Sequence, residues 1–152
     1  MPEVFRVAKL RYPVFDGTGA GLVGGRWNSP GRPVVYASTC LAGSLLEVLV
    51  HAGRMGRLPG EHHAARALIP ADLAVETVDP DLLPGWDDPQ SAVAREFGDR
   101  WLREMRTIAL YVPAVPARPL GRNVLLNAAH ADFPRVEIEA PRAVRWDGRF
   151  VV

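Results

Sequence analysis

The chain is poor in cysteine and lysine. Cys40 is the one cysteine among 152 residues, so the protein cannot form an internal disulfide. This scarcity is typical of a reducing compartment, and we expect a cytoplasmic protein. A lone cysteine is usually a small buried apolar residue, which is our expectation for Cys40. Lys9 is the one lysine, so arginine supplies nearly all of the positive charge.

The sequence also lacks a long apolar run, a basic leader and a strong net charge. No stretch approaches the roughly 18 consecutive apolar residues of a membrane span, and the start MPEVFRVAKL does not have the pattern of a secretory signal. There are 18 basic and 17 acidic side chains, and the arginines are spread from Arg6 to Arg149 among the acids. Nucleic-acid binders usually carry a basic excess or stripe. We therefore expect neither a membrane nor a direct nucleic-acid partner.

The length predicts one domain over residues 1–152, large enough to bury a core without metal or disulfide. Short apolar runs predict a mixed α/β fold with many short strands. Strict alternation of strands and helices is absent, which argues against a doubly wound sheet. The strands are expected at Glu3–Val7, Val34–Ala37, Ala65–Ile69, Ala74–Val78, Ile108–Val112, Asn123–Leu126, Val136–Glu139 and Ala143–Trp146.

Two helices are expected among these strands. The first begins at a cap on Ser38 or Thr39 and runs to Ala52, with Gly53 past its end. The second is opened by the acids and proline of Asp87-Asp88-Pro89 and runs to Met105. Phe97 and Trp101 then lie one turn apart on one face.

A glycine-rich stretch, Arg11–Pro33, is expected to be mostly irregular, and its length favours a functional loop. It contains GGRWNSPG, from Gly24 to Gly31, in which glycine and proline indicate a turn. Arg26 follows two glycines, so backbone and guanidinium can both approach an anion closely. An ion pair with one of the acids is the alternative. Trp27 is expected to pin the loop by packing rather than to take part in chemistry.

Glu47 lies in the first predicted helix, whose apolar residues cover most of its circumference. Only Ser44, Glu47 and His51 form a polar strip. The carboxylate is therefore either at a thin exposed edge or in a cleft that takes a cationic or hydroxyl-rich ligand. Tyr36 closes the preceding strand, so its phenol is either at the same edge or in the core with a bonded hydroxyl.

Polar residues also interrupt the segment NVLLNAAHADF, Asn123–Phe133. Asparagine amides suit ribose hydroxyls and carbonyls, but Asn127 fits a turn equally well, and His130 is expected to be a loop hydrogen bonder. Glu61-His62-His63 has no partner at metal-ligand spacing, so no metal site is expected. No dinucleotide-binding, phosphate-loop or serine-nucleophile motif is present.

Several of these stretches together resemble the RES-domain family, which is named for arginine, glutamate and serine and comprises bacterial toxins of toxin–antitoxin pairs. They span almost the whole chain in the family's order. One such motif would be weak evidence for the family, whereas the whole series in order is specific to it. The matching stretches are Phe5-Arg6-Val7, Gly24–Ser38 (GGRWNSPGRPVVYAS), Ser44–Gly53 (SLLEVLVHAG), Gly98–Leu102 (GDRWL), Tyr111–Ala117 (YVPAVPA) and Asn123–Phe133.

The resemblance implies an ADP-ribosyltransferase-like fold and an enzyme that depletes cellular NAD. The family breaks the nicotinamide–ribose bond by hydrolysis or with phosphate as acceptor, so NAD is a substrate and no cofactor is implied. The family's arginine, tyrosine and glutamate fall on Arg26, Tyr36 and Glu47, which implies catalytic roles for them. Its late asparagine falls on Asn127, and Gly25 is implied as a further substrate contact.

A partner is implied as well: a helical antitoxin, often with an Xre-type DNA-binding part, that covers the active site in an oligomeric complex.

Three positions depart from the family's pattern. Ala114 stands where the family has the serine of a Val-Pro-Ser motif, Val23 replaces an aromatic, and Ala128 replaces a proline. The change at the substrate-contact position 114 removes a hydroxyl whose hydrogen bond is worth about 0.5–1.5 kcal/mol. Two alternatives to NAD cleavage stay open. One is transfer of ADP-ribose to a macromolecule, and the other is a catalytically silent interaction module.

Overall fold

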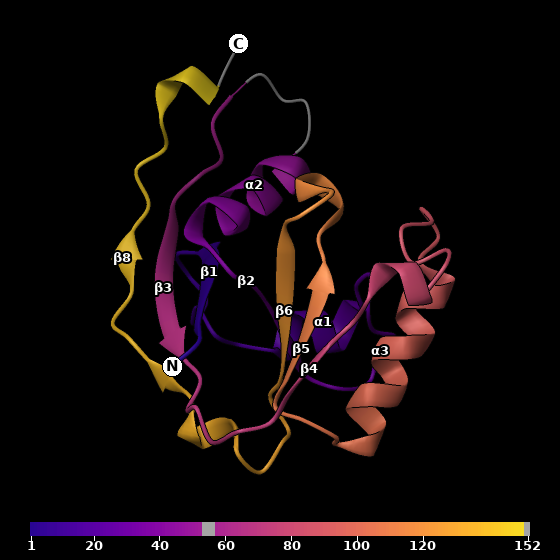
Figure 1. Cartoon of the computed structure of the whole chain (residues 1–152). Coiled ribbons are helices and arrows are strands. Elements are labelled where there is room, and N and C mark those ends of the chain that lie inside the picture. The colour runs from indigo at the N-terminus through magenta and orange to yellow at the C-terminus, as the bar shows by residue number, and fades with distance from the viewer. Residues whose placement is uncertain (53–56, 151–152) are drawn as a thin grey trace.

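A computed structural model describes residues 1–52 and 57–150 of the chain (Figure 1). These residues contain the α-helices Thr18–Val23 (α1), Leu41–Ala52 (α2) and Ala92–Glu104 (α3). The strands are Glu3–Lys9 (β1), Val34–Ser38 (β2), His62–Leu68 (β3), Val75–Thr77 (β4), Ala109–Pro113 (β5), Arg122–Asn127 (β6), Glu137–Ile138 (β7) and Arg142–Ala143 (β8). The predicted mixed α/β class is confirmed.

All strands join one eight-stranded sheet with the order β4-β5-β6-β2-β1-β3-β7, and β8 pairs with β3. β4 and β5 are parallel, and the other pairs are antiparallel. β6 and β2 lie at the middle of this order, and their register places Ser38 opposite Asn123 and Val34 opposite Asn127. The two asparagines are therefore on one face of the sheet, at opposite ends of β6.

The core has two parts, one on each face of the sheet. On one face, α3 and the loop around Trp27 pack on the central strands, with Trp101 and Leu102 fully buried. α2 lies on the same face, since the side chain of Asn123, which shares that face of β6 with Leu125, donates to Glu47 of α2 at 2.9 Å. The other face buries Val4, Val35, Ala67 and Leu126 against Val14, Phe15 and Val136 from the loops.

Both long helices form, but the second begins later than predicted. α2 ends at Ala52 as expected, and its predicted end-cap Gly53 lies outside the described residues. α3 begins at Ala92, after Ser91 in the left-handed region (φ 59°), and not at Asp87-Asp88-Pro89. Asp88 instead caps a turn, accepting from the Gln90 amide at 2.8 Å, because the backbone before α3 faces the Arg26 loop.

One further expectation is corrected, and two are confirmed. The stretch Arg11–Pro33 is mostly irregular, as predicted, and contains one short helix, α1. Cys40 is exposed rather than buried, because it lies in the turn between β2 and α2. Trp27 is core, with 2% of its surface exposed. No helix among the described residues is long and apolar enough to cross a membrane.

Candidate functional site

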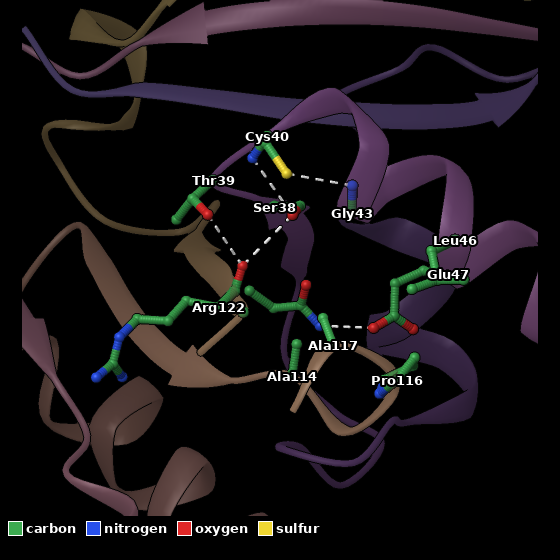
Figure 2. Close-up of a pocket in the computed structure, with 12 residues that line it drawn as sticks. Ser38, Thr39, Cys40, Gly43, Leu46, Glu47, Ala114, Pro116, Ala117 and Arg122 are labelled. Carbon is green, nitrogen blue, oxygen red and sulfur yellow. Dashed lines mark hydrogen bonds between the residues drawn. The ribbon is translucent and has the colours of Figure 1, made fainter. Parts of the chain in front are cut away.

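A cavity of about 40 Å³ lies beside α2, at the end of the sheet where β2 finishes and β6 begins (Figure 2). Sites for small molecules usually start near 300 Å³, so this cavity accommodates only a small part of a dinucleotide. Its wall combines the end of β2, the first turns of α2 and the segment that joins β5 to β6. The lining residues are Ser38, Thr39, Cys40, Gly43, Leu46, Glu47, Ala114, Pro116, Ala117, Gly121, Arg122 and Asn123.

Glu47 is the acidic group of this cavity. The amide Nδ2 of Asn123 donates to its Oε1 at 2.9 Å, from a residue 76 positions away in the chain. Its other oxygen, Oε2, lies 3.8 Å from Nε2 of His51, one helical turn on. The side chain is 29% exposed, so the carboxylate is neither buried nor free in solvent. The carboxylate lies at the wall of a cavity, which agrees with the cleft position among the two that the sequence left open.

The remaining lining is short side chains and hydroxyls. Ala114 is 3% exposed and presents only a methyl group where the resemblance expects a serine. Two hydroxyls, of Ser38 and Thr39, each donate to the Arg122 carbonyl at 3.4 Å. The sulfur of Cys40 accepts from the Gly43 amide at 3.3 Å, at the beginning of α2. The cavity therefore has hydroxyl groups of its own despite the alanine.

Arg26 is held on the same face of the sheet but outside the cavity lining. Its Nη1 donates to the carbonyls of Trp86 at 3.3 Å and Asp88 at 2.9 Å. Among the described residues it makes no ion pair, which was the alternative that the sequence left open; its partners are backbone carbonyls. These bonds use two of the five guanidinium N–H groups, so three stay available to an anion.

Tyr36 fixes the loop that carries Arg26. Its hydroxyl accepts from the Trp27 amide at 3.0 Å and donates to Oδ1 of Asn28 at 2.6 Å. Burial raises the pKa of this phenol far above its usual value, although the bond from Trp27 acts in the opposite direction. A Cβ on Gly25 would lie 2.6 Å from the Tyr36 hydroxyl oxygen, so glycine is needed for this close approach. The phenol is thus a neutral hydrogen-bonding hub.

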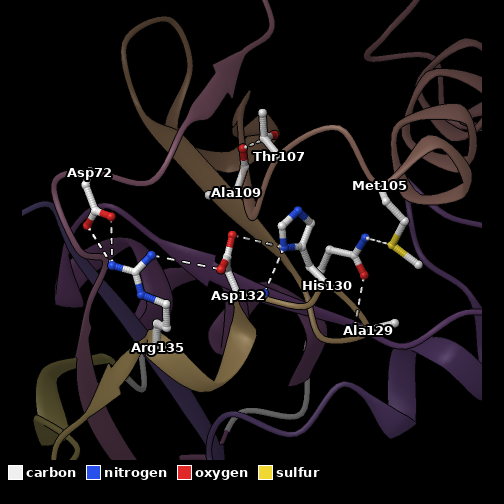
Figure 3. A network of polar contacts seen from close by, with 9 residues as sticks. Asp72, Met105, Thr107, Ala109, Ala129, His130, Asp132 and Arg135 are labelled. Carbon is white, nitrogen blue, oxygen red and sulfur yellow. Dashed lines mark hydrogen bonds and ion pairs between the residues drawn. The ribbon is translucent and has the colours of Figure 1, made fainter.

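Asn127 lies at the other end of β6, with 1% of its surface exposed. Its Oδ1 accepts from the Ala129 amide at 3.1 Å, and its Nδ2 donates to the sulfur of Met105 at 3.2 Å. His130 accepts from the Asp132 amide at 3.1 Å, as expected of a loop hydrogen bonder (Figure 3). Asn127 thereby joins the end of α3 to the turn after β6.

The structure brings Glu47 and Ala114 into one cavity and places Gly25 and Arg26 in a separate loop that Tyr36 fixes. It does not bring Asn127 to either. Sequence reasoning missed Asn123 as the partner of Glu47. The sequence did contain a signal. Asn123 and Asn127 are four residues apart in a strand and so share a face of β6, and Asn123 pairs with Ser38, just before the helix that carries Glu47.

Comparison with known proteins gives consistent results. A family model described as the RES domain matches residues 3–147. "Prs ADP-ribosylating toxin" of Sphingobium sp. (strain YBL2) is 35% identical over 140 residues, covering 90% of this chain and 86% of the relative. "Toxin Res" of Photorhabdus laumondii is 36% identical over 137 residues, covering 86% and 84%.

A solved structure, the M. tuberculosis MbcT-MbcA toxin-antitoxin complex, contains a chain with the same fold. Its TM-score to this chain is 0.74 at 16% identity, and the match covers 93% of this chain and 83% of that one.

Proposed function

The chain belongs to the RES domain family, and from this premise we propose that it is the toxin of a toxin–antitoxin pair and cleaves the nicotinamide–ribose bond of NAD. Relatives that are 35% and 36% identical over most of the chain carry toxin names. The observation that supports the chemistry best is the Glu47 carboxylate, held by Asn123 at the wall of a cavity.

The reaction suits one oriented carboxylate. Nicotinamide is cationic in NAD and leaves as a neutral molecule, so its departure needs no strong general acid. Positive charge develops on the ribose as the bond breaks, and a carboxylate beside the sugar stabilises that charge, as in glycoside cleavage. Glu47 takes this role and also accepts from a ribose hydroxyl. Water or inorganic phosphate then adds to the ribose carbon that nicotinamide has left.

The loop that carries Arg26 supplies the contacts to the rest of the dinucleotide. Arg26 binds a phosphate through the guanidinium N–H groups that do not face Trp86 and Asp88. Gly25 contributes indirectly, because its missing Cβ makes room for the Tyr36 hydroxyl against the loop. Tyr36 contributes by fixing the loop, and Asn123 orients Glu47.

The decisive experiment compares purified wild type with Glu47→Gln, which keeps the shape of the side chain and removes its charge. We expect nicotinamide release from NAD by the wild type and a loss of about 100-fold or more in kcat for the variant. Glu137→Gln, at an exposed position in β7, is the matched control and keeps full activity. An active Glu47→Gln enzyme would remove this carboxylate from the mechanism.

Transfer of ADP-ribose to a macromolecule is the second candidate function. It is favoured by the relative named "Prs ADP-ribosylating toxin", which is 35% identical to this chain. NAD labelled in its adenylate part distinguishes the two reactions. Transfer leaves the label on a protein, whereas cleavage with water or phosphate leaves all of it on small molecules.

An antitoxin partner is part of the proposal. The chain of similar fold comes from a toxin–antitoxin complex, and exposed apolar side chains lie on α2 and the β5–β6 segment, at Leu46 and Leu120. We infer an antitoxin, of Xre type as the resemblance implies, that covers the cavity. Titration with the purified antitoxin should stop nicotinamide release at a fixed molar ratio of antitoxin to enzyme. An antitoxin that binds but leaves the rate unchanged would show that it does not cover the cavity.

A further inference from the structure

The loop that carries Arg26 is anchored by α3 as well as by Tyr36. The carboxylate of Asp99 on α3 accepts two hydrogen bonds from Ser29. The Ser29 amide donates to Oδ1 at 2.7 Å, and the Ser29 hydroxyl donates to Oδ2 at 2.6 Å. Both carboxylate oxygens are therefore committed to one loop residue, 70 positions away in the chain. Such charge-assisted bonds are short and about twice as strong as neutral ones.

The residue before Asp99 sets how closely the helix approaches the loop. Gly98 is buried, and a Cβ built on it would clash with the Trp27 carbonyl oxygen. The Trp27 ring is stacked on Trp86 at 6.4 Å and meets Phe97 edge-on at 6.5 Å. Gly98 and Asp99 together hold the loop backbone directly against α3.

This anchoring reaches Arg26 through a closed turn. Gly25 and Asn28 are bridged, with the Gly25 amide donating to the Asn28 carbonyl at 2.9 Å and the reverse bond at 3.4 Å. Arg26 and Trp27 are the two central residues of this turn, and Ser29 follows it directly. A displacement of Ser29 from Asp99 therefore displaces the turn that presents the guanidinium.

We propose that Asp99 is a positioning residue for Arg26, which sets the affinity for the dinucleotide through Ser29. The inference rests on the proposed function, because Arg26 acts on the phosphates of NAD. Asp99 itself touches no substrate. Since Arg26 contributes binding of the phosphates and Glu47 the bond cleavage, loss of Asp99 raises KM and leaves kcat nearly unchanged.

The test uses the full chain with Asp99→Ala, Ser29→Ala and the double variant. Glu96→Ala is the matched control, because Glu96 is on the same helix with 80% of its side chain exposed. We expect Asp99→Ala to raise KM for NAD about tenfold and Ser29→Ala about threefold, since the latter keeps the amide bond. The double variant should match Asp99→Ala alone, because both substitutions remove the same contact. kcat should stay within about twofold in every variant.

Amide hydrogen exchange of residues 25–31 is the second readout and requires no turnover. It should become faster in Asp99→Ala and stay unchanged in Glu96→Ala. Faster exchange in Asp99→Ala with an unchanged KM would give Asp99 a merely structural role and overturn the proposal. Unchanged exchange in Asp99→Ala would overturn it as well, because the loop would then not depend on Asp99. If Asp99→Ala does not fold, the smaller change Ser29→Ala decides by the same two readouts. A wild type that releases no nicotinamide contradicts the proposed function, whereas an active wild type with an indistinguishable Asp99→Ala contradicts this inference alone.

Discussion

The two asparagines of β6 share a strand, a sheet face and an amide side chain, yet they do different things. Asn123 is half-buried and donates to a carboxylate at a cavity wall. Asn127 is fully buried and joins the sulfur of Met105 to the amide of Ala129. The difference comes from what surrounds each end of the strand. One end meets α2 and an open cavity, and the other meets the end of α3 and a tight turn.

The comparison predicts that Asn123, at the end of β6 beside the cavity, is needed for activity. Asn123→Ala should lower kcat/KM for NAD by about 100-fold, because Glu47 loses the bond that fixes its rotamer. The free energy of unfolding should fall by only about 1 kcal/mol, since the lost bond is partly exposed. Nicotinamide release and urea unfolding measure the two quantities. Full activity in this variant would show that Glu47 needs no orienting partner.

The far end of β6 should instead carry stability. Asn127→Ala removes a side chain that is 1% exposed together with its bonds to the Ala129 amide and the Met105 sulfur, which costs about 2 kcal/mol. We expect activity per folded molecule to stay within about twofold of wild type. Urea unfolding and the same nicotinamide assay decide. A selective loss of activity would instead support the sequence-based interpretation of Asn127 as a substrate contact.

A hydroxyl introduced at position 114 tests the cavity end of β6 a second time. Ala114→Ser adds a hydrogen-bonding group to the cavity lining and should raise kcat/KM by up to about tenfold. Ala128→Ser, at the far end of β6, is the matched control and should leave the rate unchanged. Equal rates for wild type and Ala114→Ser would mean that Ser38 and Thr39 already supply the hydroxyls that the reaction needs.

The smallest effect concerns Tyr36, between the two ends on the neighbouring strand. Its pKa is raised in the folded state by burial, so the folded protein keeps a proton that the unfolded chain loses above about pH 10. Deprotonation of this group in the unfolded chain therefore lowers the free energy of unfolding as pH rises, by about 1 kcal/mol between pH 10 and 11. Tyr36→Phe should show a shallower decline in alkaline urea titrations, and an identical decline would contradict the burial effect.

Much of the fold could be predicted because most elements are encoded locally. The run Val34–Ala37 is apolar and β-prone, and the structure extends it by one residue to Ser38. Trp27 was placed in the core because a large indole in a turn gains most from burial. The start of α3 could not be predicted, because the backbone at Asp88 is held by Arg26, 62 positions earlier.

The candidate site was harder to predict than the fold, for a related reason. Glu47 could be selected because it is the one acid on a helix whose residues are mostly apolar. Asn123 and Asn127 could not be distinguished, since their spacing of four residues puts both on one face of β6. Only the packing at the two ends of the strand differs. The bonds from Ser29 to Asp99 join positions 70 apart and leave no periodic signal in either segment.

The long separation between Glu47 and Asn123 has a consequence for the host cell during synthesis. α2 leaves the ribosome well before β6, and the bond between the two residues spans 76 positions. A nascent chain that ends before Arg122 carries the acid but lacks both its amide partner and the central strand that pairs with β2. A chain that stops before β6 should therefore lack the proposed activity, and premature stop codons before β6 should abolish any inhibition of growth in an expression assay.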